Sequence, residues 1–135
     1  MVYLIGLVLA LAVATLATAI GLDRGRAFYP TVLIVIASYY VLFAVMGASR
    51  HALIFEMLVA SGFLLIALVG FKKNLWFVAL ATVGHGVFDF LHHLFVANPG
   101  VPSWWPGFCL AFDVVFGCFL AMRLITRALP LPDAR

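Results

Sequence analysis

Long apolar runs alternate with short polar breaks along the whole of this 135-residue chain. A bilayer core of about 30 Å requires roughly 20 apolar residues per helix. The chain supplies five such runs, so we predict membrane-spanning helices at residues 2–21, 27–46, 52–71, 75–96 and 106–125. Because the breaks are short, successive helices should be antiparallel neighbours. The predicted fold is a single all-α domain over residues 1–135, a bundle of five transmembrane helices.

The composition agrees with this pattern. Hydrophobic residues make up 67% of the chain and charged residues 10%, whereas soluble domains have about 45–50% and roughly 25%. A soluble globule, a disordered chain and a collagen are therefore excluded. The two cysteines are too few for a disulfide framework. The eight basic residues are scattered and form no track for phosphates, so we expect no nucleic-acid partner. The expected partner is the lipid bilayer.

The basic residues also predict an orientation. With the N-terminus outside, seven of them fall on the cytoplasmic side, which is a strong positive-inside pattern. They are Arg24, Arg26, Lys72, Lys73, Arg123, Arg127 and Arg135, and the outer side has only Arg50. The first run is not a signal peptide, since its basic residues follow the apolar segment instead of preceding it. We expect the C-terminus in the cytoplasm and the protein in a bacterial cytoplasmic (inner) membrane.

Ionisable residues inside the predicted spans mark the candidate site. Three carboxylates (Glu56, Asp89 and Asp113) and three histidines (His85, His92 and His93) lie there. Each such group costs at least ~2.5 kcal/mol in hydrocarbon, so it usually faces a cavity or a partner. Asp23 and Asp133 fall in a loop and in the tail, where we expect water to solvate them. Depth along each span places the six groups in the outer half of the membrane, so we predict a shared polar pocket capped by the 97–106 loop.

The fourth span carries the most specific pattern. His85, Asp89 and His92 are spaced i, i+4, i+7 and therefore share one helix face. Imidazole and carboxylate ligands in such a trio suit a divalent metal ion, with zinc preferred to iron. Gly84 and Gly86 flank His85 and would let a neighbouring backbone or a ligand approach. The sequence therefore predicts a metal site on this helix.

Catalytic roles follow from the neighbouring spans. Glu56 and Asp113 are the expected fourth ligand, orienting group or general base, and Glu56 or His93 would move the proton. Cys109 shares a helix face with Asp113 and is a further ligand candidate. The leading hypothesis is a metal-dependent membrane enzyme, a hydrolase or an oxidoreductase, that acts on a lipid or another hydrophobic substrate.

Other readings of the same residues stay open. The polar groups could form interhelical hydrogen bonds, or belong to a proton- or ion-coupled transport module, although the inner half offers few polar stepping stones. A third reading is an accessory subunit that binds a partner or cofactor. The small-residue ladder of Gly6, Ala10 and Ala14 predicts a close helix contact, either within the chain or in a homo-oligomer.

Two segments carry a resemblance to known proteins. With Arg-Ala-Phe-Tyr-Pro at 26–30 and Gly-His-Gly-Val-Phe-Asp-Phe-Leu-His-His at 84–93, the chain resembles small bacterial multi-span membrane proteins, which implies a membrane bundle and no particular activity. The His92-His93 pair resembles the histidine boxes of membrane hydroxylases and desaturases, but those need far more histidines than the four present. The pattern is also similar to membrane zinc hydrolases of the alkaline ceramidase type, which have more spans and a serine–histidine motif not found here.

Overall fold

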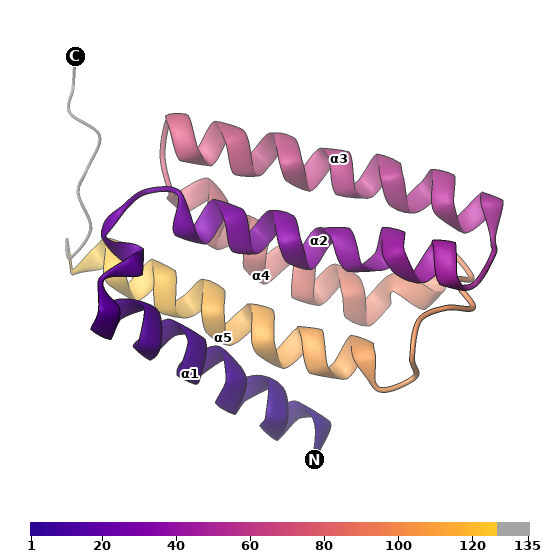
Figure 1. The fold of residues 1–135 in the computed structure, drawn as a ribbon, viewed down its shortest axis with the longest axis horizontal. Helices are drawn as coiled ribbons and strands as arrows, with labels where there is room; N and C mark the ends of the chain where they lie inside the picture. The colour runs from indigo at the N-terminus through magenta and orange to yellow at the C-terminus, as the bar shows by residue number, and fades with distance from the viewer. Residues whose placement is uncertain (127–135) are drawn as a thin grey trace.

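The computed structural model describes residues 1–126 as a bundle of five α-helices (Figure 1). The helices are α1 (Val2–Ile20), α2 (Phe28–Met46), α3 (Arg50–Lys72), α4 (Trp76–Leu91) and α5 (Trp105–Ile125). Two short 3₁₀ helices, η1 (Leu22–Arg24) and η2 (His92–Leu94), follow α1 and α4. The described part of the chain contains no strand, and the predicted all-α bundle is confirmed.

Four of the helices, α1, α2, α3 and α5, are long and apolar enough to cross a membrane. The fourth predicted span is shorter than expected, because the α-helical backbone tightens into η2 at His92. The 16 residues of α4 cover about 24 Å at 1.5 Å per residue, and η2 adds about 6 Å at 2.0 Å per residue. The helical part of this segment therefore approaches the thickness of a bilayer core only when both pieces are counted.

Local chemistry explains where several helices begin and end. Gly21 ends α1 in the left-handed conformation, with φ 77°, which costs a glycine little. The Ser49 hydroxyl accepts a hydrogen bond from the backbone N–H of Ala52 and so caps the start of α3. Pro106 lies in the first turn of α5, where a missing backbone N–H leaves no hydrogen bond unmade.

The helices pack in pairs around α4 and α5. These two helices make the most extensive contact, α1 lies against α5, and α2 lies against α3. The predicted ladder of Gly6, Ala10 and Ala14 is buried, and a side chain on Gly6 would collide with the backbone of α5 at Phe108. This ladder therefore makes a contact within the chain.

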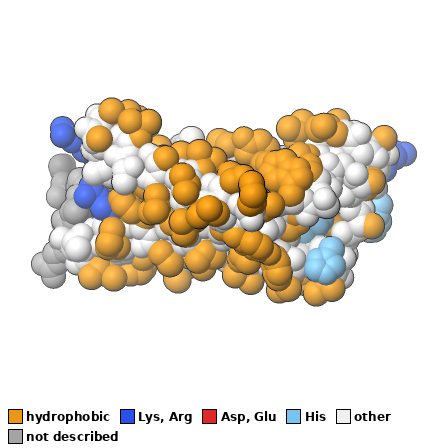
Figure 2. Space-filling view, turned by 90° about the horizontal axis from the view of Figure 1, so that it is seen from below, with side chains coloured by type: hydrophobic (Ala, Val, Ile, Leu, Met, Phe, Trp, Pro, Cys, Tyr) orange, Lys and Arg blue, Asp and Glu red, His pale blue; other side chains and the backbone are white. Residues whose placement is uncertain are grey.

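The surface is apolar along the bundle and charged at its ends. Figure 2 shows hydrophobic side chains along the whole length of one face, with Lys or Arg at both ends and no carboxylate in view. The loops at one end carry Arg24, Arg26, Lys72 and Lys73, whereas Arg50 lies at the other end, at the start of α3. Which end faces the cytoplasm stays a prediction of the positive-inside rule, and Arg127, Asp133 and Arg135 lie outside the described residues.

The expectation that water solvates Asp23 is wrong. Asp23 is only 1% exposed, because η1 places its carboxylate between the ends of three helices. Asp23 Oδ2 accepts hydrogen bonds from Thr18 Oγ1 at 2.9 Å and Tyr29 OH at 3.3 Å, and it pairs with Arg123 at 3.2 Å. This cluster ties α1, α2 and α5 together at the end opposite the candidate site.

Candidate metal centre

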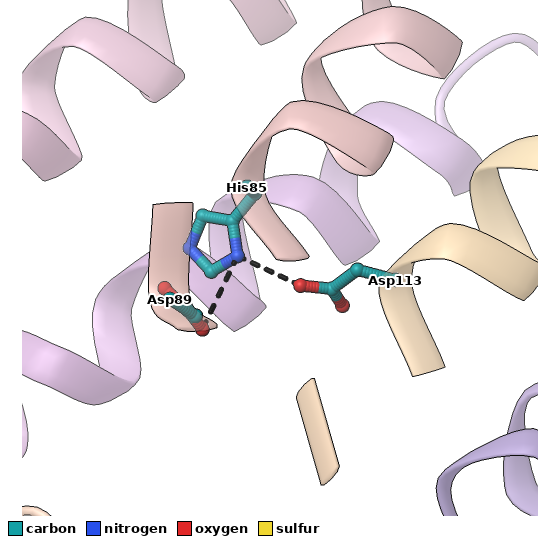
Figure 3. A group of neighbouring side chains, drawn as sticks. All are labelled: His85, Asp89 and Asp113. Atoms are coloured by element: carbon teal, nitrogen blue, oxygen red, sulfur yellow. Dashed lines mark hydrogen bonds and ion pairs between the residues drawn. The ribbon is translucent and has the colours of Figure 1, made fainter. Parts of the chain in front are cut away.

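A histidine and two aspartates meet between α4 and α5. His85 and Asp89 lie one turn apart on α4, and Asp113 projects toward them from α5 (Figure 3). The Nδ1 atom of His85 is 2.8 Å from Asp113 Oδ2 and 3.5 Å from Asp89 Oδ2. One ligand atom from each residue lies within 4.8 Å of the other two, and all three residues are buried. The three side chains can therefore bind a single ion.

A glycine allows Asp113 to reach α4. A Cβ placed on Gly86 would lie 2.8 Å from Asp113 Cβ and 3.2 Å from the carbonyl oxygen of Cys109. Ordinary carbon–carbon contacts are about 3.5–4.0 Å, so no larger residue fits without separating the helices. Gly84 has open space around it. The close approach predicted for the glycines beside His85 is thus found at Gly86 and not at Gly84.

The two aspartates have oxygens with no hydrogen-bond partner among the described residues. These are both carboxylate oxygens of Asp89 and Oδ1 of Asp113. Asp89 is 1% exposed and Asp113 is 0% exposed, so bulk water does not solvate them. Buried carboxylates normally have hydrogen-bond or ionic partners. These carboxylate oxygens therefore lack a further group, either a cation or a hydrogen-bond donor, that would compensate their burial.

A second buried cluster lies at the C-terminal end of α4. His92 Nε2 is 2.6 Å from Glu56 Oε1 on α3, and the ring of Tyr40 on α2 packs 4.4 Å from the His92 ring, between centroids. The i, i+4, i+7 trio of His85, Asp89 and His92 is therefore not gathered around one point. Asp113 completes the group with His85 and Asp89, while His92 pairs with Glu56.

Asn98 joins this second cluster to the loop that follows η2. Its side-chain Nδ2 donates to Glu56 Oε1 and to the carbonyl oxygen of Tyr40, each at 3.1 Å. Sequence analysis did not identify Asn98, since an asparagine before Pro99 looks like ordinary turn chemistry. The buried hydroxyl of Tyr40 has no hydrogen-bond partner among the described residues. Tyr40 therefore belongs to the second cluster through its ring contact with His92 and its carbonyl contact with Asn98.

The remaining candidates are placed less centrally. His93 is exposed and makes no described hydrogen bond to either cluster, and His51 is also exposed. Cys109 is buried on α5, one turn before Asp113, but its sulfur is not among the ligand atoms that lie within 4.8 Å of one another. Neither Cys109 nor His93 therefore belongs to the group of His85, Asp89 and Asp113.

Two hollows adjoin these clusters. The first, which we call the lateral groove, has a volume of about 1010 Å³ and lies between α2 on one side and α1 and α5 on the other, with Cys109 and Asp113 in its wall. The second, which we call the vestibule, has a volume of about 920 Å³ and lies beneath the loop of residues 96–104, with His92, His93 and Asn98 in its wall. Each cluster therefore has at least one buried residue beside a hollow, and the hollow differs between the two clusters.

Compared with known proteins, the chain matches no family model, no curated protein and no solved structure. Its function is therefore inferred from the residues of this centre and from the hollows around it.

Proposed function

We propose that this protein is a metal-dependent membrane enzyme whose His85, Asp89 and Asp113 side chains hold a divalent ion. Zinc is preferred to iron because nitrogen and carboxylate oxygen ligands in a site with an open position suit catalytic zinc. The substrate would be a lipid or another hydrophobic molecule, since the wall that contains Asp113 is otherwise apolar.

The oxygens of Asp89 and Asp113 that accept no hydrogen bond are the observation that carries this proposal. Two ionised carboxylates beside one neutral imidazole form a group of charge −2, which is costly away from water. A divalent cation supplies the missing charge and the missing partners in one step. The 3.5 Å separation between His85 Nδ1 and Asp89 Oδ2 matches the ~3.4 Å between ligands of a tetrahedral ion with bonds of ~2.1 Å. The 2.8 Å between His85 Nδ1 and Asp113 Oδ2 is a hydrogen-bond distance, so this pair would separate by roughly 0.6 Å when an ion binds.

The chemistry of such a site is general. A bound divalent ion lowers the pKa of a coordinated water or polarises a substrate oxygen. The residues of this chain would position the reacting atoms and hold the proton. Asp113 is the ligand nearest the lateral groove, so a substrate in the groove would approach the ion from its α5 side.

The pair of Glu56 and His92 is the candidate for proton storage. Their 2.6 Å contact is buried, yet His92 also lines the vestibule, so a proton can exchange between this pair and water there. The ring of Tyr40 packs against His92 of this pair. His93, at the rim of the vestibule, remains a second candidate for the same role.

The core between the candidate metal centre and the Asp23 cluster does not favour the transport of protons or ions. Between the His85 group and the Asp23 cluster the core is built of apolar residues, among them Leu33, Phe116 and Leu120. Thr82 is buried there, and its hydroxyl donates to the carbonyl oxygen of Val78. A proton or an ion would find no further ionisable side chain on this path within the described residues.

The first test is metal binding. The protein, purified in detergent and stripped with a chelator, is titrated with Zn²⁺, and we expect one ion per chain. Asp113→Asn and His85→Ala should each lower the affinity at least about 10-fold, as loss of a ligand or its support does. His93→Ala is the matched control and should bind zinc like the unsubstituted protein. Equal affinity in all four proteins would overturn the assignment.

The second test is turnover. Zinc-loaded protein, zinc-stripped protein and Asp113→Asn are each incubated with a total membrane lipid extract, and mass spectrometry follows every lipid species. The proposal expects at least one species to be converted by the zinc-loaded protein alone. Stoichiometric zinc without any conversion would leave the metal centre in place and reject the enzymatic role on lipids.

A further inference from the structure

The lateral groove has the dimensions of one lipid chain. Its lining extends from Tyr39 and Trp105, which pack on each other at one level, to Phe28 at the other, where Phe28 packs on Phe116 in the core behind the groove. Eleven residues separate these levels on each helix, which is about 16 Å at 1.5 Å per residue. One leaflet of a ~30 Å hydrocarbon core is about 15 Å thick, so an extended acyl chain fits between the two levels.

The groove is continuous with the surface that the bilayer covers. Its walls include the membrane-facing side chains Ile5, Leu9 and Val35, which are 55%, 44% and 46% exposed. A water-filled groove with apolar walls inside a bilayer is unfavourable, and the nearest apolar molecules there are lipids. The occupant that this surface admits is therefore a lipid chain moving in from the side.

Two polar groups interrupt the apolar wall on the α5 side. Cys109 and Asp113 lie four and eight residues after Trp105, about 6 and 12 Å along the helix. Asp113 is fully buried, and its Oδ1 atom has no hydrogen-bond partner among the described residues. A chain in the groove would therefore pass along the α5 wall behind which this ligand of the candidate metal centre is buried.

The vestibule offers room for the other end of the same molecule. It shares Val2 and Trp104 with the lateral groove, so the two hollows adjoin. Its wall contains the exposed His93, which makes no described hydrogen bond to either cluster, whereas the His92 and Asn98 side chains in the same wall already contact the Glu56 carboxylate. The exposed imidazole of His93 complements an anionic phosphate.

We propose that the lateral groove binds one acyl chain of a bilayer phospholipid, whose phosphate headgroup lies at the vestibule, and that this lipid is the substrate class of the metal centre. The substrate role depends on the proposed function, whereas the binding of the chain does not. The lipid enters between α2 and α5 from the membrane and not through the vestibule from water.

Electron spin resonance in nanodiscs tests the groove. A phosphatidylcholine with a spin label on its acyl chain reports the number of immobilised lipids per protein. Val35→Trp fills the groove and should remove one immobilised lipid. Leu42→Trp is the matched control, since Leu42 lies on the same helix with 50% exposure and lines neither hollow. It should immobilise as many lipids as the unsubstituted protein.

Several outcomes would overturn the inference. The first is that Val35→Trp immobilises as many lipids as the unsubstituted protein. The second is that both tryptophan variants lose the same number of immobilised lipids. The third is that the protein immobilises a spin-labelled fatty acid but not the spin-labelled phospholipid. Zinc content is measured on the same samples. Asp113→Asn should lose zinc and keep the lipid, while Val35→Trp should do the reverse. If no sample binds zinc but the Val35→Trp difference persists, the proposed function fails and the lipid site stands.

Discussion

Gly86→Ala tests whether the contact between α4 and α5 builds the metal centre. The added methyl group would lie 2.8 Å from Asp113 Cβ, and carbon atoms in contact need about 3.5–4.0 Å. The backbone carbonyl oxygens of Cys109 and Leu110 lie at 3.2 and 3.3 Å from the same position. Because backbone atoms cannot rotate away as a side chain can, α5 itself must move.

The required displacement gives the expected magnitude. Asp113 must retreat by roughly 0.7–1.2 Å to restore an ordinary contact, whereas metal–ligand distances tolerate about 0.2 Å. We therefore expect zinc affinity to fall at least about 10-fold, or ~1.4 kcal/mol. Overpacking should also lower the free energy of unfolding by about 1–3 kcal/mol, partly offset by the ~1 kcal/mol that alanine gains over glycine within a helix.

The assay is isothermal titration of zinc-stripped protein with Zn²⁺, together with thermal unfolding of the same samples. Gly84→Ala is the matched control, since it lies two residues away on α4 with open space around it. It should bind zinc normally and be no less stable. If Gly86→Ala binds zinc as tightly as Gly84→Ala, the close helix contact does not position Asp113 and the reasoning is refuted.

Three further predictions concern the buried polar contacts outside the centre. Glu56→Ala leaves His92 and Asn98 without their shared acceptor, so it should lower the free energy of unfolding by about 3 kcal/mol. The variant should still bind one zinc per chain, and loss of zinc from the folded variant would contradict this. Arg123→Met leaves Asp23 buried without a cation, so its thermal midpoint should fall well below that of Arg123→Lys, and equal midpoints would show that the pair contributes nothing. Asn98→Ala should increase hydrogen exchange in residues 97–104 without changing exchange in α5, and unchanged exchange in that loop would mean that Asn98 does not hold it.

The fold was predicted well from the sequence because a lipid environment allows few backbone structures. In hydrocarbon every backbone polar group must be satisfied within the segment, so long apolar runs separated by polar breaks leave helices as the solution. The end of α4 was missed because η2 begins at His92, and residues 87–97 around it include no proline or glycine to mark the change. Hydrophobicity predicts a span without specifying where its backbone tightens.

The site was predicted in part. Periodicity along one helix placed His85 and Asp89 together, and both lie in the candidate centre. Whether His92 or Asp113 is the third residue of the centre depends on how closely α5 approaches α4 at Gly86. The periodicity of a single helix gives no information about that approach. Asp23 was misjudged for a similar reason, because its position in a loop suggested exposure, while its partner Arg123 lies 100 residues away.

X-ray absorption spectroscopy of the zinc-loaded protein tests the central claim most directly, because it counts the imidazoles on the metal. The account predicts one zinc per chain with light ligands at about 2.0–2.1 Å and the outer scattering of a single imidazole, that of His85, which persists in His92→Ala and is lost in His85→Ala. Two imidazoles on the zinc, or a spectrum that changes in His92→Ala and not in Asp113→Asn, would contradict it.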